Sequence, residues 1–112
     1  MSVLQQAIQE RRKALGLPDQ IDADRFPNLI ALFDDIIKRF PNRPVFSCLG
    51  HTITYSDLDK HANAFAAYIQ NHTDLKPGDR IALQLPNILQ FPVAGIGALR
   101  AGLIVVNTNP LY

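Results

Sequence analysis

The sequence predicts an α/β protein. A helical stripe of apolar residues follows Asn28, and a short apolar alternation around Gly50 indicates a β-hairpin. Strand, helix and strand patterns then follow one another between Arg80 and Val106. A strand–helix–strand segment this short is a βαβ unit, whose two strands are parallel with a right-handed crossover. We therefore expect helices, a short β-hairpin and a βαβ unit with parallel strands.

The first predicted element is a helix over Ser2–Leu15, which Gly16 and Pro18 end. Its apolar stripe is narrow and interrupted, which favours a docking or frayed terminal helix over a helix that lies on a membrane surface. The segment Pro18–Phe26 is predicted to be an extended linker. The helix and this linker are therefore predicted to precede the main body of the chain.

A clearer helix follows, with Asn28 as its N-cap and Pro41 as its stop. Its apolar residues recur at helical spacing and are predicted to form a broad stripe that faces the core: Leu29, Leu32, Phe33, Ile36, Ile37 and Phe40. Pro44–Leu49 and Thr52–Thr54 are predicted strands of a hairpin, with Gly50 and His51 in the turn.

A third helix is predicted from Thr54 to about His72. Thr54 and Asp57 have the spacing of a capping box, with Asp in place of the usual Glu. One face of this helix is apolar: Leu58, Ala62, Phe65, Ala66 and Ile69. Lys76–Asp79 is predicted to be a turn.

The βαβ unit begins with a strand over Arg80–Leu85. The helix that follows, over about Leu89–Ala101, tolerates Pro92 only in its first turn, and Gly102 suits its C-terminus. Leu103–Val106 is a run of four apolar residues, typical of a strand buried on both faces. Because the chain stops soon after this strand, we expect it to be a fragment that self-associates or exchanges strands through its exposed surface.

Composition narrows the possible functions. The net charge of +1 gives no basic patch for nucleic acid, so no nucleic-acid partner is expected. Cys48 is the single cysteine, which excludes an intramolecular disulfide and suits a reducing compartment. No apolar run is long enough to span a membrane, and the first 15 residues do not resemble a secretory signal.

Several residue groups could carry chemistry, but each has a simpler structural interpretation. Gly95-Ile96-Gly97 starts like a dinucleotide fingerprint, yet Arg100 stands where the third Gly belongs, and the required preceding strand is missing. Close packing of a helix on the sheet explains these glycines better. The histidines do not have metal-site spacing, and we expect them on the surface: His51, His61 and His72.

Two further groups of polar residues could carry chemistry. Ser47, Cys48 and His51 do not form a nucleophile elbow, because neighbouring strand residues point to opposite faces. The acidic pairs Asp34-Asp35 and Asp57/Asp59 lie on predicted helices with basic or polar neighbours, which favours solvated faces. The sequence therefore assigns no catalytic, cofactor-binding or metal-binding residue.

From about Asp24 onward the chain resembles the beginning of the adenylate-forming enzymes, and specifically the long-chain fatty acyl-CoA synthetases. The resemblance implies an N-terminal helix and linker at 1–23 and a truncated N-terminal portion of the AMP-binding domain at 24–112. The resemblance lies in motifs that occur in the family's order: Thr52–Leu58, Ala62–Ile69, Leu75–Leu83, Leu85-Pro86-Asn87, Gln90–Val93 and Leu99–Tyr112. The early motifs are shared broadly, whereas the last two are typical of the long-chain branch.

The resemblance implies a parent enzyme that uses ATP and Mg²⁺ to convert a long-chain fatty acid to an acyl-adenylate, and then forms acyl-CoA with coenzyme A. It implies a scaffold role for this region, because the family's phosphate loop, nucleotide-binding residues and mobile lysine are not among these residues. We expect the chain alone to be inactive and to bind none of these cofactors. The expected location is cytoplasmic, with peripheral association at the inner face of the membrane.

Two alternatives remain open. The chain could be a stand-alone interaction or scaffold module that uses Leu103–Val106 as a docking edge. It could also be the start of another adenylate-forming enzyme that acts on an aryl or short-chain acid.

Overall fold

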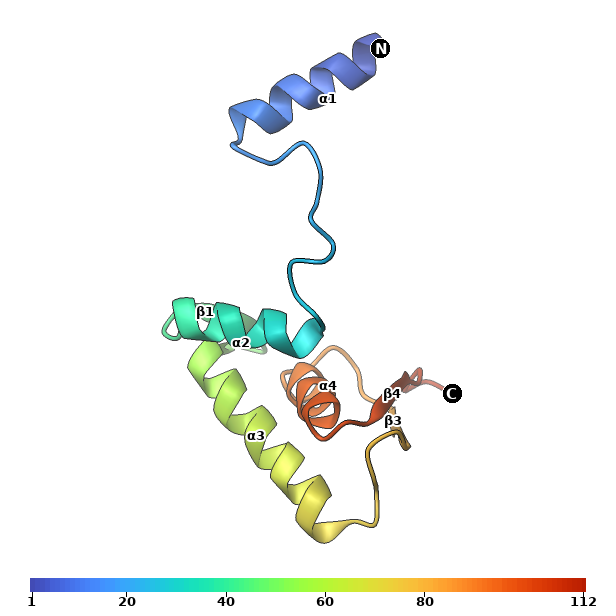
Figure 1. Ribbon diagram of the computed structural model, residues 1–112. Coiled ribbons are helices and arrows are strands. Elements are labelled where there is room, and N and C mark those ends of the chain that lie inside the picture. Colours follow the sequence, from blue (N-terminus) through green and yellow to red (C-terminus); the bar gives the residue numbers. More distant parts are fainter.

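The computed structural model describes all 112 residues and confirms the α/β class (Figure 1). Four helices and four strands follow one another, and the strands form two separate two-stranded sheets. The elements are α1 (Val3–Ala14), α2 (Leu29–Arg39), β1 (Pro44–Cys48), β2 (His51–Thr54), α3 (Tyr55–His72), β3 (Arg80–Leu83), α4 (Gln90–Arg100) and β4 (Ile104–Asn107).

Helix α1 stands apart from the rest of the molecule, at the end of the irregular chain that leads to α2 (Figure 1). It packs against no other helix or strand. Its N-terminus carries a capping box: the Ser2 hydroxyl accepts from the Gln5 backbone N–H at 3.2 Å, and the Gln5 side chain accepts from the Ser2 N–H at 2.8 Å. These bonds satisfy backbone donors that a helix terminus leaves without partners.

Helix α2 begins as predicted, because the Asn28 side chain accepts a hydrogen bond from the Ala31 N–H at 2.9 Å. It lies across α3 and α4. Its stripe is less buried than the sequence predicted: no α2 residue is fully buried, and Leu29 is exposed. The residues that pack on the core are Ile30 and Phe33.

The hairpin of β1 and β2 is antiparallel, but its turn lies one residue earlier than predicted. The two turn residues are Leu49 and Gly50, both with positive φ (51° and 78°). Turns of this kind match the twist of the strands, although a branched residue such as Leu rarely adopts positive φ. His51, predicted in the turn, is the first residue of β2 and pairs with Cys48.

Helix α3 starts with the predicted capping box. The Thr54 hydroxyl accepts from the Asp57 N–H at 3.2 Å, and the Asp57 carboxylate accepts from the Thr54 N–H at 2.9 Å. The apolar face of α3 is confirmed as the centre of the fold, with Phe65 packed at its margin and these residues buried: Leu58, Ala62, Ala66 and Ile69.

The βαβ unit is confirmed: β3 and β4 are parallel, with Arg80 opposite Ile104 and Leu83 opposite Asn107. β3 ends at Leu83 rather than Leu85, and β4 is shifted one residue toward the C-terminus. Pro92 occupies the first turn of α4, and Gly102 has a φ of 81° after its end, both as predicted.

The sheet of β3 and β4 is covered on one face. Leu83 and Leu103 are buried on the covered side, where Val105 packs against the core. On the other side Ile104 is 48% exposed and Val106 is 42% exposed. The apolar run predicted to be buried on both faces therefore has one open face in this structure.

Helices α3 and α4 pack closely because α4 carries a glycine at their contact. A Cβ on Gly97 would lie 2.7 Å from the Ala62 carbonyl oxygen and 2.9 Å from the Phe65 side chain. The prediction that these glycines pack on the sheet was wrong for Gly97, which faces α3. Only Gly95 faces the sheet, where an added Cβ would lie 3.9 Å from Leu83.

Candidate functional site

The carboxyl ends of β3 and β4 form the edge at which open α/β sheets usually bind ligands. Polar groups meet here: the Gln84 side chain donates to the Asn109 carbonyl at 3.4 Å, and the Leu111 N–H donates to the Asn109 side chain at 2.9 Å. The Thr108 N–H donates to the Leu83 carbonyl at 3.0 Å and extends the strand pairing. These bonds order the chain after β4.

The glycine-rich segment lies inside α4 rather than before a helix. Gly95 is at the centre of the helix Gln90–Arg100, and Gly97 is in its second half. Backbone N–H groups at such positions bond carbonyls of the preceding turn, so they are not free to hold a phosphate. The geometry supports a packing role for both glycines.

Arg100 is the most connected side chain of the molecule. Although α4 carries it, its guanidinium contacts both α2 and α3: Nη2 lies 2.9 Å from an oxygen of Asp34 and 2.9 Å from an oxygen of Asp59. Nη1 donates to the Asn63 side chain at 2.8 Å and to the Asp59 carbonyl at 3.3 Å. Its side chain is only 11% exposed. Arg100 therefore joins three helices, and sequence reasoning missed this role.

Asp34 and Asp59 were predicted on solvated faces, and their side chains do keep solvent access, at 59% and 39% exposed. The sequence did not predict that both also bind Arg100. Asp35 pairs with Arg39 one turn along α2 at 2.7 Å. Asp57 caps α3, and its pKa is lowered from the ordinary value of 3.8 chiefly by the hydrogen bond from the Thr54 backbone and then by that from the Thr54 hydroxyl. All four carboxylates thus have structural partners.

The histidines are exposed, as predicted. His51 from β2 and His61 from α3 nevertheless line one open groove of about 340 Å³ beside Gln90. His72 stacks on Tyr68 with ring centroids 5.2 Å apart. No three His, Cys, Asp or Glu side chains are grouped closely enough to hold a metal ion.

Cys48 and His51 face one another across the hairpin, because they are register partners in antiparallel strands. The two side chains therefore lie on the same face of the hairpin, contrary to the expectation from alternation along a single strand. The Cys48 thiol is instead directed to the Asn87 carbonyl, with the two atoms 3.7 Å apart. The Ser47 hydroxyl bonds the Thr52 hydroxyl of the opposite strand. Both side chains join neighbouring segments and neither contacts a base.

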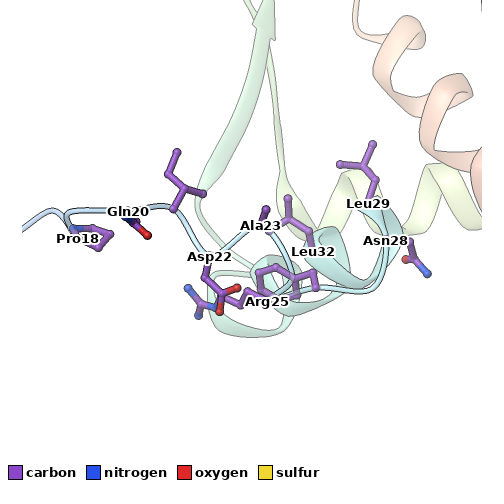
Figure 2. Close-up of a pocket in the computed structure, with 10 residues that line it drawn as sticks. Pro18, Gln20, Asp22, Ala23, Arg25, Asn28, Leu29 and Leu32 are labelled. Carbon is purple, nitrogen blue, oxygen red and sulfur yellow. The ribbon is translucent and has the colours of Figure 1, made fainter.

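The largest groove, about 590 Å³, lies where the linker meets the start of α2 (Figure 2). Leu29 and Leu32 line its helical side, and Asp22 and Arg25 come from the linker. The Arg25 guanidinium lies 5.1 Å from the centre of the Phe26 ring. The groove is open, and all the residues that line it come from the linker and the adjoining start of α2. It is a surface depression formed by one continuous segment of chain.

Comparison with solved structures shows that this fold is part of a larger α/β domain. The Klebsiella oxytoca NpsA N-terminal subdomain in complex with 3-hydroxyanthranilyl-AMSN superposes with a TM-score of 0.74 and 26% identity, over 79% of this chain and 22% of that one. The shared architecture is that of the opening part of a larger α/β domain.

Residues 33–112 match the family described as AMP-binding enzyme. The chain belongs to this family. It is 48% identical over 101 residues to the long-chain-fatty-acid–CoA ligase of Salmonella typhimurium, and 47% identical over 101 residues to that of Escherichia coli O6:H1. Each match covers 90% of this chain and 18% of the ligase, so the chain spans about a fifth of the length of these curated relatives.

Proposed function

We propose that the protein to which this chain belongs activates long-chain fatty acids with ATP and transfers them to coenzyme A. The main support is the 47–48% identity, over nine-tenths of the chain, to proteins named long-chain-fatty-acid–CoA ligase. Forming an acyl-adenylate gives the carboxylate a good leaving group, and the CoA thiol can then displace AMP. The family membership itself implies use of ATP.

In this proposal the 112 residues are a scaffold. Arg100 and Gly97 hold α2, α3 and α4 together, and the resulting layer supports the parallel strands. Mg²⁺ would assist the chemistry on the phosphates in the whole enzyme. Asp34, Asp35, Asp57 and Asp59 do not fit that metal, because they cap a helix or bind arginine. We therefore assign no catalytic step to these residues. The location we propose for the whole enzyme is cytoplasmic, with peripheral association at the inner face of the membrane.

The test of the reaction is acyl-CoA formation by the whole protein. We expect turnover with hexadecanoate, ATP, Mg²⁺ and CoA, and little with anthranilate or acetate. A clear preference for anthranilate would favour the aryl-acid alternative, for which the NpsA likeness is the supporting observation. A preference for acetate would favour a short-chain enzyme.

The 112-residue chain is expected to bind no ATP and to form no acyl-CoA. Titration calorimetry with ATP tests this. Binding at millimolar or lower concentration would contradict the scaffold role, provided that circular dichroism shows a folded chain.

We further propose that the isolated chain self-associates through the open face of β3 and β4. Ile104 and Val106 are exposed there, and each strand of a two-stranded sheet has an unpaired edge. Sedimentation analysis should show association that increases with concentration and weakens in Val106→Lys. Lys60→Gln, on a different surface, is the control. A monomer at all concentrations would overturn this proposal but would not affect the proposed reaction.

A further inference from the structure

Exposed apolar side chains are concentrated at the N-terminus. Fourteen large apolar or aromatic residues are exposed in the whole chain, and half of them lie within the first 21 residues. These seven are Met1, Val3, Leu4, Ile8, Leu15, Leu17 and Ile21. Since α1 packs against no other element of the chain, this apolar surface has no internal cover.

The side chains of α1 are divided between two faces. At 3.6 residues per turn, Leu4 and Ile8 share one face with Ala7 and Leu15. Gln6 and Gln9 lie on the opposite face with Lys13. Arg11 interrupts the apolar face, but a long arginine side chain can lie along apolar surface and extend its charge to a polar boundary.

The charges at this end of the chain are mostly positive. Arg11, Arg12 and Lys13 follow one another in the last turn of α1, the N-terminal amine adds a fourth cation, and Glu10 is the single acid in residues 1–16. Arg12 is partly engaged, since its guanidinium donates to the Pro18 carbonyl at 2.7 Å. Apolar and cationic groups side by side are complementary to a surface with an apolar interior and an anionic outer layer.

A helix as short as α1 is marginal in water when it packs on nothing. Its capping box limits fraying but leaves the apolar face in water. An anionic lipid surface would cover that face and attract the cations, at about 1 kcal/mol for each Lys or Arg near the surface. Docking on the remaining elements of this chain, the simplest expectation from the sequence, is not what the structure shows.

We propose that α1 binds the surface of anionic membranes, with Leu4 and Ile8 in the interface and Arg11–Lys13 at the lipid phosphates. The helix lies in the plane of the surface and does not cross it; no helix of the chain is long and apolar enough to do so. This deepens the proposed function, because a long-chain fatty acid concentrates in bilayers and α1 would hold the enzyme there. That benefit rests on the proposed function, whereas lipid binding by α1 does not.

The test is co-sedimentation of the chain with vesicles of phosphatidylglycerol and phosphatidylcholine, or of phosphatidylcholine alone. We expect binding to the anionic vesicles, with a gain of helical circular dichroism, and at least tenfold weaker binding to the neutral ones. Leu4→Glu with Ile8→Glu should abolish binding. Gln6→Glu with Gln9→Glu changes the net charge by the same amount as the first pair, but on the opposite face of α1. This variant should retain most of the binding to anionic vesicles.

Arg11→Gln with Lys13→Gln removes two cations and should weaken binding to anionic vesicles about 30-fold, from roughly 1 kcal/mol for each cation. Absence of binding by the unaltered chain, or equal loss in both glutamate pairs, would overturn the proposal. So would an oligomer without lipid that depends on Leu4 and Ile8, because it would show that a second copy covers this face. None of these outcomes tests fatty-acid activation, which the whole protein reports separately.

Discussion

At the residue scale, close contacts and hydrogen bonds decide what each side chain does. Gly95 and Gly97 lie two residues apart in one helix, yet only Gly97 meets a neighbouring backbone. Thr54 and Asp57 bond one another as their spacing predicts. Sequence spacing therefore identifies a local bond such as the capping box, but it cannot tell which glycine meets another helix.

We expect Gly97→Ala to destabilise the chain by about 1–2 kcal/mol. Alanine gains up to about 1 kcal/mol in helix propensity, but overpacking costs typically about 1–3 kcal/mol, and the Ala62 backbone oxygen cannot move aside easily. Gly95→Ala is the matched control, and it should be neutral or stabilising because its Cβ meets only ordinary contact. Thermal unfolding of both variants measures the difference; equal melting temperatures would contradict the close-packing role.

Asp57 should make stability depend on acid pH. Its pKa in the folded chain is below the ordinary value of 3.8, so its stabilising effect is complete above that value and is lost as the pH falls through the lower folded pKa. Asp57→Asn should therefore melt earlier near neutral pH and lose less further stability below pH 3.8 than the unaltered chain. Parallel melting curves against pH for the two proteins would contradict this.

At the scale of elements, packing is organised by α3. Leu58 and Ala62 belong to the cluster beneath the hairpin, and Ala66 and Ile69 belong to the cluster beneath β3 and β4. The apolar period of this helix predicted all four as core residues. The ion pairs that join α4 to α2 and α3 were not predictable, because Asp34 and Asp59 are far from Arg100 in the chain.

Arg100→Met should cost about 1–2 kcal/mol of stability, because it removes hydrogen bonds to three side chains and leaves the methylene packing partly in place. The value stays modest because both carboxylates can be hydrated. Arg39→Met removes a more exposed pair with Asp35 and should cost below about 0.5 kcal/mol. Chemical denaturation of the two variants measures their free energies of unfolding. An equal loss of stability in both would show that Arg100 contributes no more than an ordinary surface ion pair.

Leu103→Asp should destabilise the whole protein by several kcal/mol, as expected for a buried charge without a partner. Val105→Asp, at a half-buried position on the same face, should also be destabilising. In the isolated chain Val106→Asp should be tolerated, since that side chain is exposed. Unaltered melting of the Leu103 variant would show that this residue is not part of the core.

At the scale of the whole molecule, the core is small, and the N-terminal and C-terminal segments differ in how they relate to it. Eleven of the 112 residues are buried, all between Ile53 and Leu103. The N-terminal helix lies outside this body, and β4 presents an open face at the other end (Figure 1). The division between 1–23 and 24–112 is accordingly a proposal that truncation can test.

Deletion of residues 1–23 should change the free energy of unfolding by less than about 0.5 kcal/mol, as for other surface changes away from the core. The physical reason is that α1 contacts no other element. Denaturant unfolding of the two chains measures the difference. A loss of several kcal/mol would show that α1 or the linker docks on the body in solution.

The sequence by itself determined the fold class, the order and type of the elements, and the local caps, because apolar period, proline and glycine positions, and capping residues act over a few neighbours. The motifs in their order also determined the family. Only the tertiary structure decided the contacts of Gly97, the bonds of Arg100, the pairing of Cys48 with His51, and the absence of cover on α1. Those features depend on how distant segments approach one another, and the residue pattern of one segment does not identify the segment that it contacts.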